Sequence, residues 1–126
     1  MHDVISTTVS MFNRSINVLV SSGETERFAL VPAGGGELFW RHDTFGADDD
    51  SGRASQWLAH GGRLTVGQVL ARVPQCRREV LRWTREEIEA GPHHFDLDLF
   101  EQHARQASLA RLADELAAAE AAERAA

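Results

Sequence analysis

The feature that most constrains the fold is a series of strand-like segments in the first half of the chain. β-Branched and aromatic residues, which favour strands, gather in four segments: VISTTVSMF (4–12), INVLVSS (16–22), RFALV (27–31) and ELFWRHDTF (37–45). Short turns separate these segments, and the last turn is the glycine-rich PAGGG (32–36). The polar, acidic stretch GADDDSGRAS (46–55) then reads as a loop. The first half is therefore predicted to be β-structure.

Composition places the chain among ordinary globular proteins, with 43% hydrophobic and 25% charged residues. It holds no apolar run near the roughly 18 residues of a membrane span, and the first twelve residues lack the pattern of a secretory signal. Cys76 is the only cysteine, so no internal disulfide is possible, which fits a reducing compartment. We therefore predict a cytoplasmic protein with no membrane partner.

The charge of the chain is unevenly distributed. The net charge is −6, yet residues 51–85 hold seven arginines against one acid, Glu79, and so carry a net charge of +6. All thirteen basic residues are arginine. Arginine makes planar, bidentate contacts to phosphate and stacks on rings, although a general preference for arginine codons would give the same bias. The basic region is a candidate contact surface for nucleic acid.

The second half of the chain has a helical pattern. Thr84 and Glu87 have the spacing of a capping box, and Gly91-Pro92 is a stop signal, which together predict a short helix over 85–90. A second helix is expected to begin at Asp96 or Asp98, because apolar residues then recur at helical spacing: Phe100, Ala104, Ala107, Leu112 and Leu116. This C-terminal helix offers a surface for a protein partner or for homodimerisation.

The order of the strand-like pieces resembles that of a cold-shock domain, a member of the OB-fold class. TVSMFN (8–13) is similar to the first strand of that family, and Phe28-Ala29-Leu30 stands where the family has its F-G-F-like motif. LFWRH (38–42) stands where the family has an L-F-V-H-like strand after a Pro- and Gly-containing turn. Leu58, Gly61 and Leu64 match the L-x-x-G-x-x-V spacing that opens its fourth strand. The chain departs from the family in losing an aromatic at residue 30, where Leu30 stands, and in the insertion RSINVLVSSGETE.

The resemblance implies an α+β fold, with a small five-stranded antiparallel OB-type β-barrel followed by a C-terminal helical extension. We expect a barrel domain over residues 1–83, with the fifth strand near 78–83, and a helical extension over 84–126. It also implies binding of single-stranded RNA or DNA on an aromatic face, without an enzymatic activity or a cofactor.

Strand alternation divides the aromatic cluster of residues 38–42 between two faces. Leu38 and Trp40 are expected to point into the core, which leaves Phe39 and Arg41 outward as a stacking and phosphate-binding pair. Phe28 would extend the stacking surface from the neighbouring strand, and Trp57 would close one edge. The predicted nucleic-acid-binding residues are Phe28, Phe39, Arg41, His42, Arg53, Trp57 and Arg63.

A second hypothesis places a helix-turn-helix in TVGQVLARVPQCRREVLRW (65–83). Thr65 and Gln68 form a possible capping box, Pro74-Gln75 a turn, and CRREVLRW an arginine-rich recognition helix. The segment looks like the first helices of regulators of the MerR type, with Pro74 in place of the turn glycine. Gly67 and the capping pattern at Thr84 count against a helix, so we favour a strand over 64–73. Helices there would select a DNA-binding regulator.

A third hypothesis is a protein-interaction adaptor or inhibitor that acts on a nucleic-acid-handling machine, of the kind that phages and bacteria encode. Acidic surface or the C-terminal helix would then bind the partner. Enzymatic sites are not expected, because no nucleophile lies in a recognisable setting. His93, His94, Asp96, Asp98 and His103 lie across a loop and a helix start, so we predict no metal site either.

Overall fold

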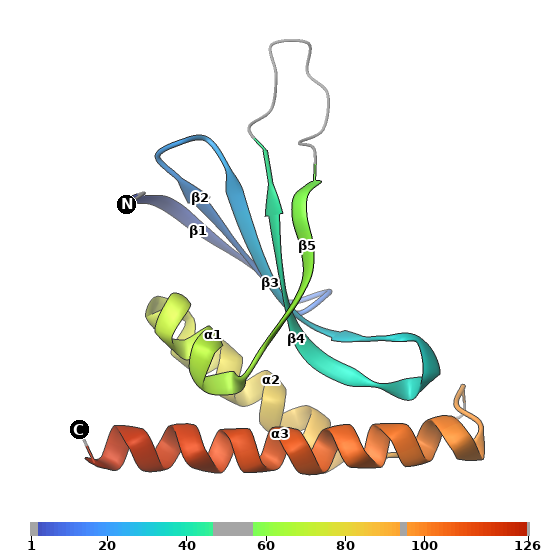
Figure 1. Ribbon diagram of the computed structural model, residues 1–126. Coiled ribbons are helices and arrows are strands. Elements are labelled where there is room, and N and C mark those ends of the chain that lie inside the picture. Colours follow the sequence, from blue (N-terminus) through green and yellow to red (C-terminus); the bar gives the residue numbers. More distant parts are fainter. Residues whose placement is uncertain (1–2, 47–56, 94–95, 126) are drawn as a thin grey trace. The chain divides into compact units, whose positions relative to one another are not determined.

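A computed structural model describes residues 3–46, 57–93 and 96–125, with only the backbone of residues 57–61. The elements follow one another as five strands and then three α-helices, with two short 3-10 turns between them (Figure 1). The strands are β1 (Val4–Ser10), β2 (Ser15–Val20), β3 (Thr25–Pro32), β4 (Leu38–Phe45) and β5 (Trp57–Leu64). The helices are α1 (Val66–Arg72), α2 (Arg77–Ala90) and α3 (Leu99–Ala125), and the 3-10 turns are η1 (Gly34–Gly36) and η2 (Pro74–Cys76).

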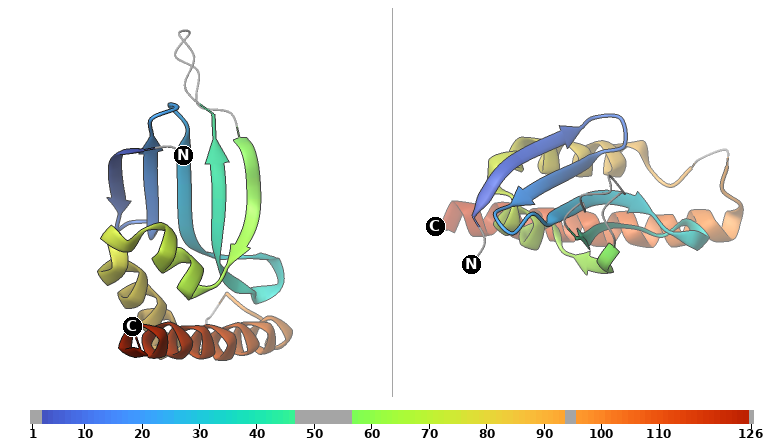
Figure 2. Two further views of the ribbon diagram at one scale, coloured as in Figure 1. Left: turned by 60° about the vertical axis from the view of Figure 1, so that its left-hand side comes forward. Right: turned by 90° about the horizontal axis from the view of Figure 1, so that it is seen from above.

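The five strands form one antiparallel sheet in the order β1-β2-β3-β4-β5 (Figure 2). The first four strands coincide closely with the four strand-like segments of the sequence, because each carries an alternating or continuous apolar pattern between turn residues. The α+β class, the five antiparallel strands and the C-terminal helical extension are confirmed. Within the described residues each strand neighbours its sequence neighbours, so the strand order is that of a meander without the closing pairs of an OB-type barrel.

The region after residue 64 differs from the prediction. Residues 66–72 and 77–90 are helices, so the strands expected over 64–73 and 78–83 are wrong, and the fifth strand lies at Trp57–Leu64. Thr84 does not begin a helix but lies inside α2, and residue 83, the predicted domain boundary, also lies within α2. The stop at Gly91 is confirmed: its φ is 76°, and its N–H donates to the carbonyls of Glu87 and Ile88.

Contacts within the chain divide it into two compact units. The first unit comprises Met1–Ala29 and Arg41–Arg63, and the second unit comprises Leu30–Trp40 and Leu64–Ala126. The first unit is β-structure. From Ile16 onward β2 alternates, since Ile16, Val18 and Val20 are buried while Asn17 and Leu19 are partly exposed.

The second unit is built around two tryptophans. Trp40 and Trp83 are both buried, and their rings stack with centroids 6.3 Å apart. The indole N–H of Trp40 donates to Thr84 Oγ1 at 3.1 Å, and that hydroxyl donates to the carbonyl of Val80 at 2.7 Å. The burial expected for Trp40 is thus confirmed, and its only polar atom is satisfied by a hydroxyl on α2.

The glycine turn η1 lies against α3 within this second unit. A Cβ atom placed on Gly36 would lie 2.2 Å from the carbonyl oxygen of Glu101, so the backbone approach requires a residue without a side chain. The next strand residue, Leu38, donates its N–H to Ser108 Oγ at 3.1 Å and accepts from the Arg111 guanidinium at 2.5 Å. PAGGG is therefore a docking segment for α3.

The long helix α3 begins where the sequence predicted. Asp98 caps it, because Asp98 Oδ1 accepts from the Glu101 N–H at 2.8 Å, while Glu101 Oε1 accepts from the Asp98 N–H at 3.4 Å. Of the predicted apolar series only Leu112 and Leu116 are buried, together with Leu109, whereas Phe100 is 80% exposed and Ala107 is also exposed. The first part of the predicted spacing therefore does not mark the inward face of the helix. Across the described parts of the chain, no helix combines the length and hydrophobicity needed to cross a membrane.

Candidate nucleic-acid interface

Helix α1 begins at the capping box that the sequence indicated. Thr65 Oγ1 accepts from the Gln68 N–H at 3.2 Å, and Gln68 Oε1 accepts from the Thr65 N–H at 2.8 Å. Glu115 on α3 accepts from the N–H of Val66 at 3.1 Å, so a third N-terminal donor is also satisfied. These three bonds explain why a segment rich in β-branched valines forms a helix here.

A tight turn joins α1 to α2. Val73 ends α1, and Pro74–Cys76 form a single 3-10 turn from which α2 continues at Arg77. Proline fits at the first position of this turn because its missing N–H is not required there. Val69, Val73 and Val80 are fully buried on the two helices. Helices α1 and α2 also contact each other. Together they make a helix-turn-helix arrangement.

Cys76 ends this turn, directly before α2, and is buried. Burial, with a smaller contribution from the charge of Glu79, raises the pKa of the Cys76 thiol. The side chain therefore acts as a small apolar packing residue, as the sequence suggested.

The exposed side of the helix pair carries arginines. Arg78, Arg82 and Arg85 follow one another at helical spacing on the outer side of α2, opposite its buried residues Val80 and Thr84. Arg72 and Arg77 are exposed at the two sides of the turn. Within the described residues Arg78 has neither a hydrogen-bond partner nor an ion-pair partner. The helix pair thus presents five guanidinium groups, each with a planar array of donors.

Carboxylates of α3 hold two of these guanidinium groups. Arg77 makes a bidentate pair with Glu123, with Nε at 2.8 Å from Oε1 and Nη2 at 2.5 Å from Oε2. The hydrogen bond with Arg77 lowers the pKa of Glu123, and the same bond raises the pKa of Arg77. Arg85 pairs with Glu120 through a single contact, from its Nη2 to Glu120 Oε1. A phosphate that binds Arg77 or Arg85 must therefore displace a carboxylate.

The residues predicted as a stacking surface are not all on one face. Phe28 is only 1% exposed and stacks on His42 with ring centroids 4.8 Å apart, and His42 Nε2 lies 3.0 Å from Glu26 Oε1. Arg41 lies on the opposite face from His42, because neighbouring strand residues alternate, and its Nε donates to Asp43 at 3.0 Å. Phe28 therefore has no exposed ring face for a base and does not share a face with Arg41.

The remaining predicted residues are dispersed. Phe39 is half-buried in the second unit, and Arg63 is exposed at the end of β5. Trp57 begins β5, but its side chain lies outside the described part of the structure, as does the whole of Arg53. Sequence reasoning placed the site on the strands and treated Arg77, Arg78 and Arg82 as the alternative. The capping box at Thr65 was the signal that could have identified the helix pair, although the sequence analysis favoured a strand.

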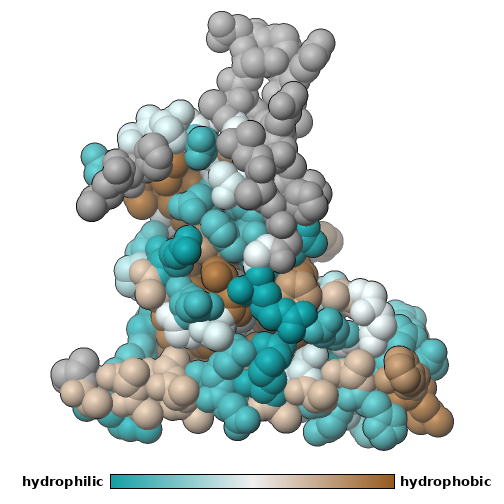
Figure 3. All heavy atoms as spheres, viewed as in Figure 1, coloured by the Kyte–Doolittle hydropathy of each residue, from teal (hydrophilic) through white to brown (hydrophobic). Residues whose placement is uncertain are grey.

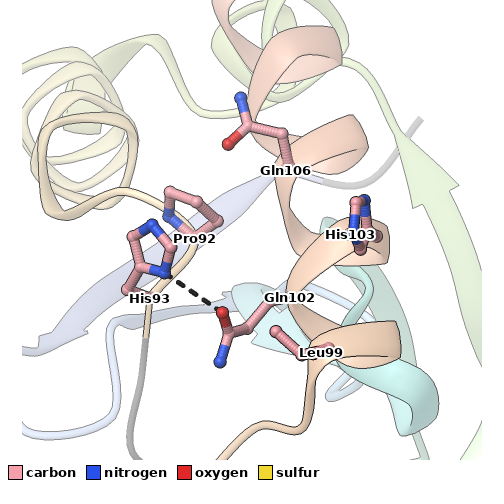
Figure 4. A pocket seen from close by; sticks show the side chains of 6 residues that line it. All are labelled: Pro92, His93, Leu99, Gln102, His103 and Gln106. Carbon is pink, nitrogen blue, oxygen red and sulfur yellow. Dashed lines mark hydrogen bonds between the residues drawn. The ribbon is translucent and has the colours of Figure 1, made fainter.

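A hollow beside the start of α3 contains two of the histidines considered as metal ligands (Figure 4). His93 points toward Gln102, and its Nδ1 lies 3.1 Å from Gln102 Oε1, while the ring of His103 lies apart on α3. In the described ranges no three histidine, cysteine or acidic side chains converge as a metal site would require. The hollow is lined by Pro92, His93, Leu99, Gln102, His103 and Gln106.

The chemistry that the helix pair offers is the recognition of anions by guanidinium groups on a rigid helix. Five arginines accompany one acid, Glu79, over residues 65–85, and the acids Glu86, Glu87 and Glu89 follow in the last turns of α2, whereas the chain as a whole carries a net charge of −6. Planar guanidinium groups suit phosphate oxygens and the paired acceptors of guanine. No family model, curated protein or solved structure matches the chain.

Proposed function

We propose that the protein binds duplex DNA through the helix-turn-helix formed by α1 and α2, with α2 as the recognition helix. The observation that supports this proposal is the helical state of residues 66–72 and 77–90 with a short turn between them. A strand in this region would have favoured the single-stranded hypothesis. A helix with its side chains is about as wide as the roughly 12 Å major groove.

The arrangement of α2 supports this choice. Its first half carries Arg77, Arg78 and Arg82, and residues near the start of a recognition helix are those that reach base edges. Its inner side is fixed by the buried stack of Trp40 and Trp83. A rigid helix places its arginines with little loss of conformational entropy on binding, which favours specific recognition.

Arg78→Ala is expected to weaken binding to a specific duplex by about 1–3 kcal/mol, which is roughly 5- to 150-fold. Fluorescence anisotropy with a labelled duplex, selected from a random pool, measures this loss. Arg124→Ala is the matched control, because Arg124 is exposed near the end of α3 and removes the same charge. Equal losses in the two variants, or tighter binding of a single strand of the same sequence, would contradict the proposal.

Single-stranded binding and the adaptor role stay predictions, and the same titration separates them. A preference for single strands would instead support nucleic-acid binding through the sheet residues Phe39 and Arg41. No binding to any oligonucleotide, together with a stable complex with another protein, would favour the adaptor.

Replacing Glu120 and Glu123 together by glutamine is expected to raise duplex affinity by roughly fivefold, because Arg77 and Arg85 lose their competing carboxylates. The slope of log binding constant against log salt concentration is expected to steepen by up to about two, because up to two more counterions are released from the DNA. Asp114→Asn is the control, since it removes one exposed charge from the same helix away from both arginine pairs. An equal gain in the control would assign the effect to net charge alone.

A further inference from the structure

Exposed hydrophobic side chains are concentrated on one edge of the first unit. Among the described residues six large hydrophobic side chains are exposed, and four of them lie on β1 or in the turn after it. Val4 is 55% exposed, Ile5 62%, Met11 57% and Phe12 100%. Brown surface is visible over the β1 and β2 strands in Figure 3. A soluble protein rarely gathers such side chains without an interaction that covers them.

β1 is also the edge strand of the sheet. It pairs with β2 on one side, and no other strand of the described residues pairs with its outer side (Figures 1 and 2). Edge strands that stay unpaired are usually protected by charged residues or proline. Residues 4–12, VISTTVSMF, contain neither, and only a register shift between Val4 and Ser6 interrupts the strand. Within the described residues this edge therefore has no strand on its outer side, and it carries no charged residue or proline that would hinder another strand from binding.

The regular part of β1 is complementary to a second copy of itself. An antiparallel pair related by a twofold axis at Thr8 sets Ser6 opposite Ser10 and Thr7 opposite Val9. Ser6, Thr8 and Ser10 lie on one face of the sheet, opposite Leu19, Asn17 and Ser15 in the register with β2. Hydroxyl side chains thus meet hydroxyl side chains, and the β-branched Thr7 meets the β-branched Val9.

The same axis also matches the ends of the strand. It places Val4 and Ile5 of one copy beside the end of the other copy's strand, where the turn that carries the exposed Met11 and Phe12 begins. The charged residues that flank this stretch are Asp3 and Arg14, which have opposite signs. No like charges are opposed anywhere along residues 3–14.

We propose that two copies of this chain associate through their β1 edges, antiparallel about a twofold axis at Thr8, and so join two sheets into one. The inference rests on the first unit and is independent of DNA binding. A paired edge of this length is a small interface, so we expect an equilibrium between monomer and dimer.

The introduction of a charge at residue 8, where the axis lies, tests this arrangement. In sedimentation equilibrium the wild-type chain is expected to approach twice its 13.9 kDa mass as its concentration rises. Thr8→Lys and Thr8→Glu are each expected to stay monomeric, because Thr8 is exposed and each copy then opposes a like charge. An equimolar mixture of the two variants is expected to form the dimer again.

Ser22→Lys serves as the control, because Ser22 is an exposed hydroxyl residue in the turn after β2. It is expected to dimerise as the wild type does. A monomeric wild type would overturn the proposal, as would dimers of Thr8→Lys alone. A mixture that stays monomeric would overturn the axis at Thr8. None of these results depends on whether duplex DNA binds.

Discussion

Gly36→Ala is expected to destabilise the second unit by several kcal/mol, far more than alanine at either neighbouring glycine. The added Cβ would lie 2.2 Å from the Glu101 carbonyl oxygen, and backbone rather than a flexible side chain blocks it. Overpacking of this kind costs roughly 1–3 kcal/mol, and the positive φ of 87° adds about 1–2 kcal/mol for a residue with a Cβ. Chemical denaturation followed by far-UV circular dichroism measures the loss.

The two neighbours separate the causes. Gly35 has a φ of 78° but open space around its Cβ position, so Gly35→Ala is expected to show the backbone cost alone. Gly34 has open space and no positive φ, so Gly34→Ala is expected to be close to neutral. If Gly36→Ala costs no more than Gly35→Ala, the close approach of this turn to α3 does not exist in solution.

Trp40→Ala is expected to lower the free energy of unfolding by about 3–5 kcal/mol, the usual cost of removing a fully buried tryptophan. The side chain is 0% exposed, stacks on Trp83 and donates to Thr84 Oγ1. The loss combines a cavity with a broken hydrogen bond inside the core. Denaturant unfolding followed by circular dichroism is again the measurement.

Phe39→Ala is the matched control for Trp40→Ala, because Phe39 is the adjacent aromatic residue and is only half-buried. It is expected to cost clearly less than Trp40→Ala. Similar losses would mean that the inward and outward faces of β4 have been assigned incorrectly. A small loss at Trp40 would show that the stack with Trp83 does not hold the second unit together.

The first four strands could be predicted because their signals are local. β-Branched and aromatic residues bounded by turn residues indicate β1 to β4, and Leu38 and Trp40 are buried as alternation required. The Asp98 cap and the Gly91 stop are equally local signals, and both are confirmed.

The helix pair could not be decided from local signals, because they disagreed. Gly67 and the valines of residues 66–73 favour a strand, whereas the capping box at Thr65 favours a helix. Contacts distant in sequence settle the outcome, among them the Glu115 carboxylate that accepts from Val66. At Thr84 the capping pattern was misleading, because the hydroxyl bonds to Val80 inside α2 and to Trp40.

The candidate site lies on the helix pair and not on the predicted strands, again because contacts distant in sequence decide which side chains are available. Phe28 carried the signal of an exposed aromatic only by its resemblance to a family motif, and the structure buries it against His42. The carboxylates that hold Arg77 and Arg85 come from residues 123 and 120, far along the chain. No spacing within residues 65–85 could have indicated them.

The makeup of the second unit has a consequence for modularity. Its core joins Trp40 to Thr84 and Leu38 to Ser108, pairs that are 44 and 70 positions apart in the chain. The helix-turn-helix therefore cannot be excised as the continuous fragment 64–126, since that fragment would lack the strand segment that supports α2. Transfer of the helix pair to another protein would need residues 30–40 as well, joined most simply by a circular permutation. The two parts of this unit are separated in sequence by residues 41–63, which belong to the first unit. Closing a long loop costs entropy, so we expect the second unit to form late in folding, after the strands in between have formed.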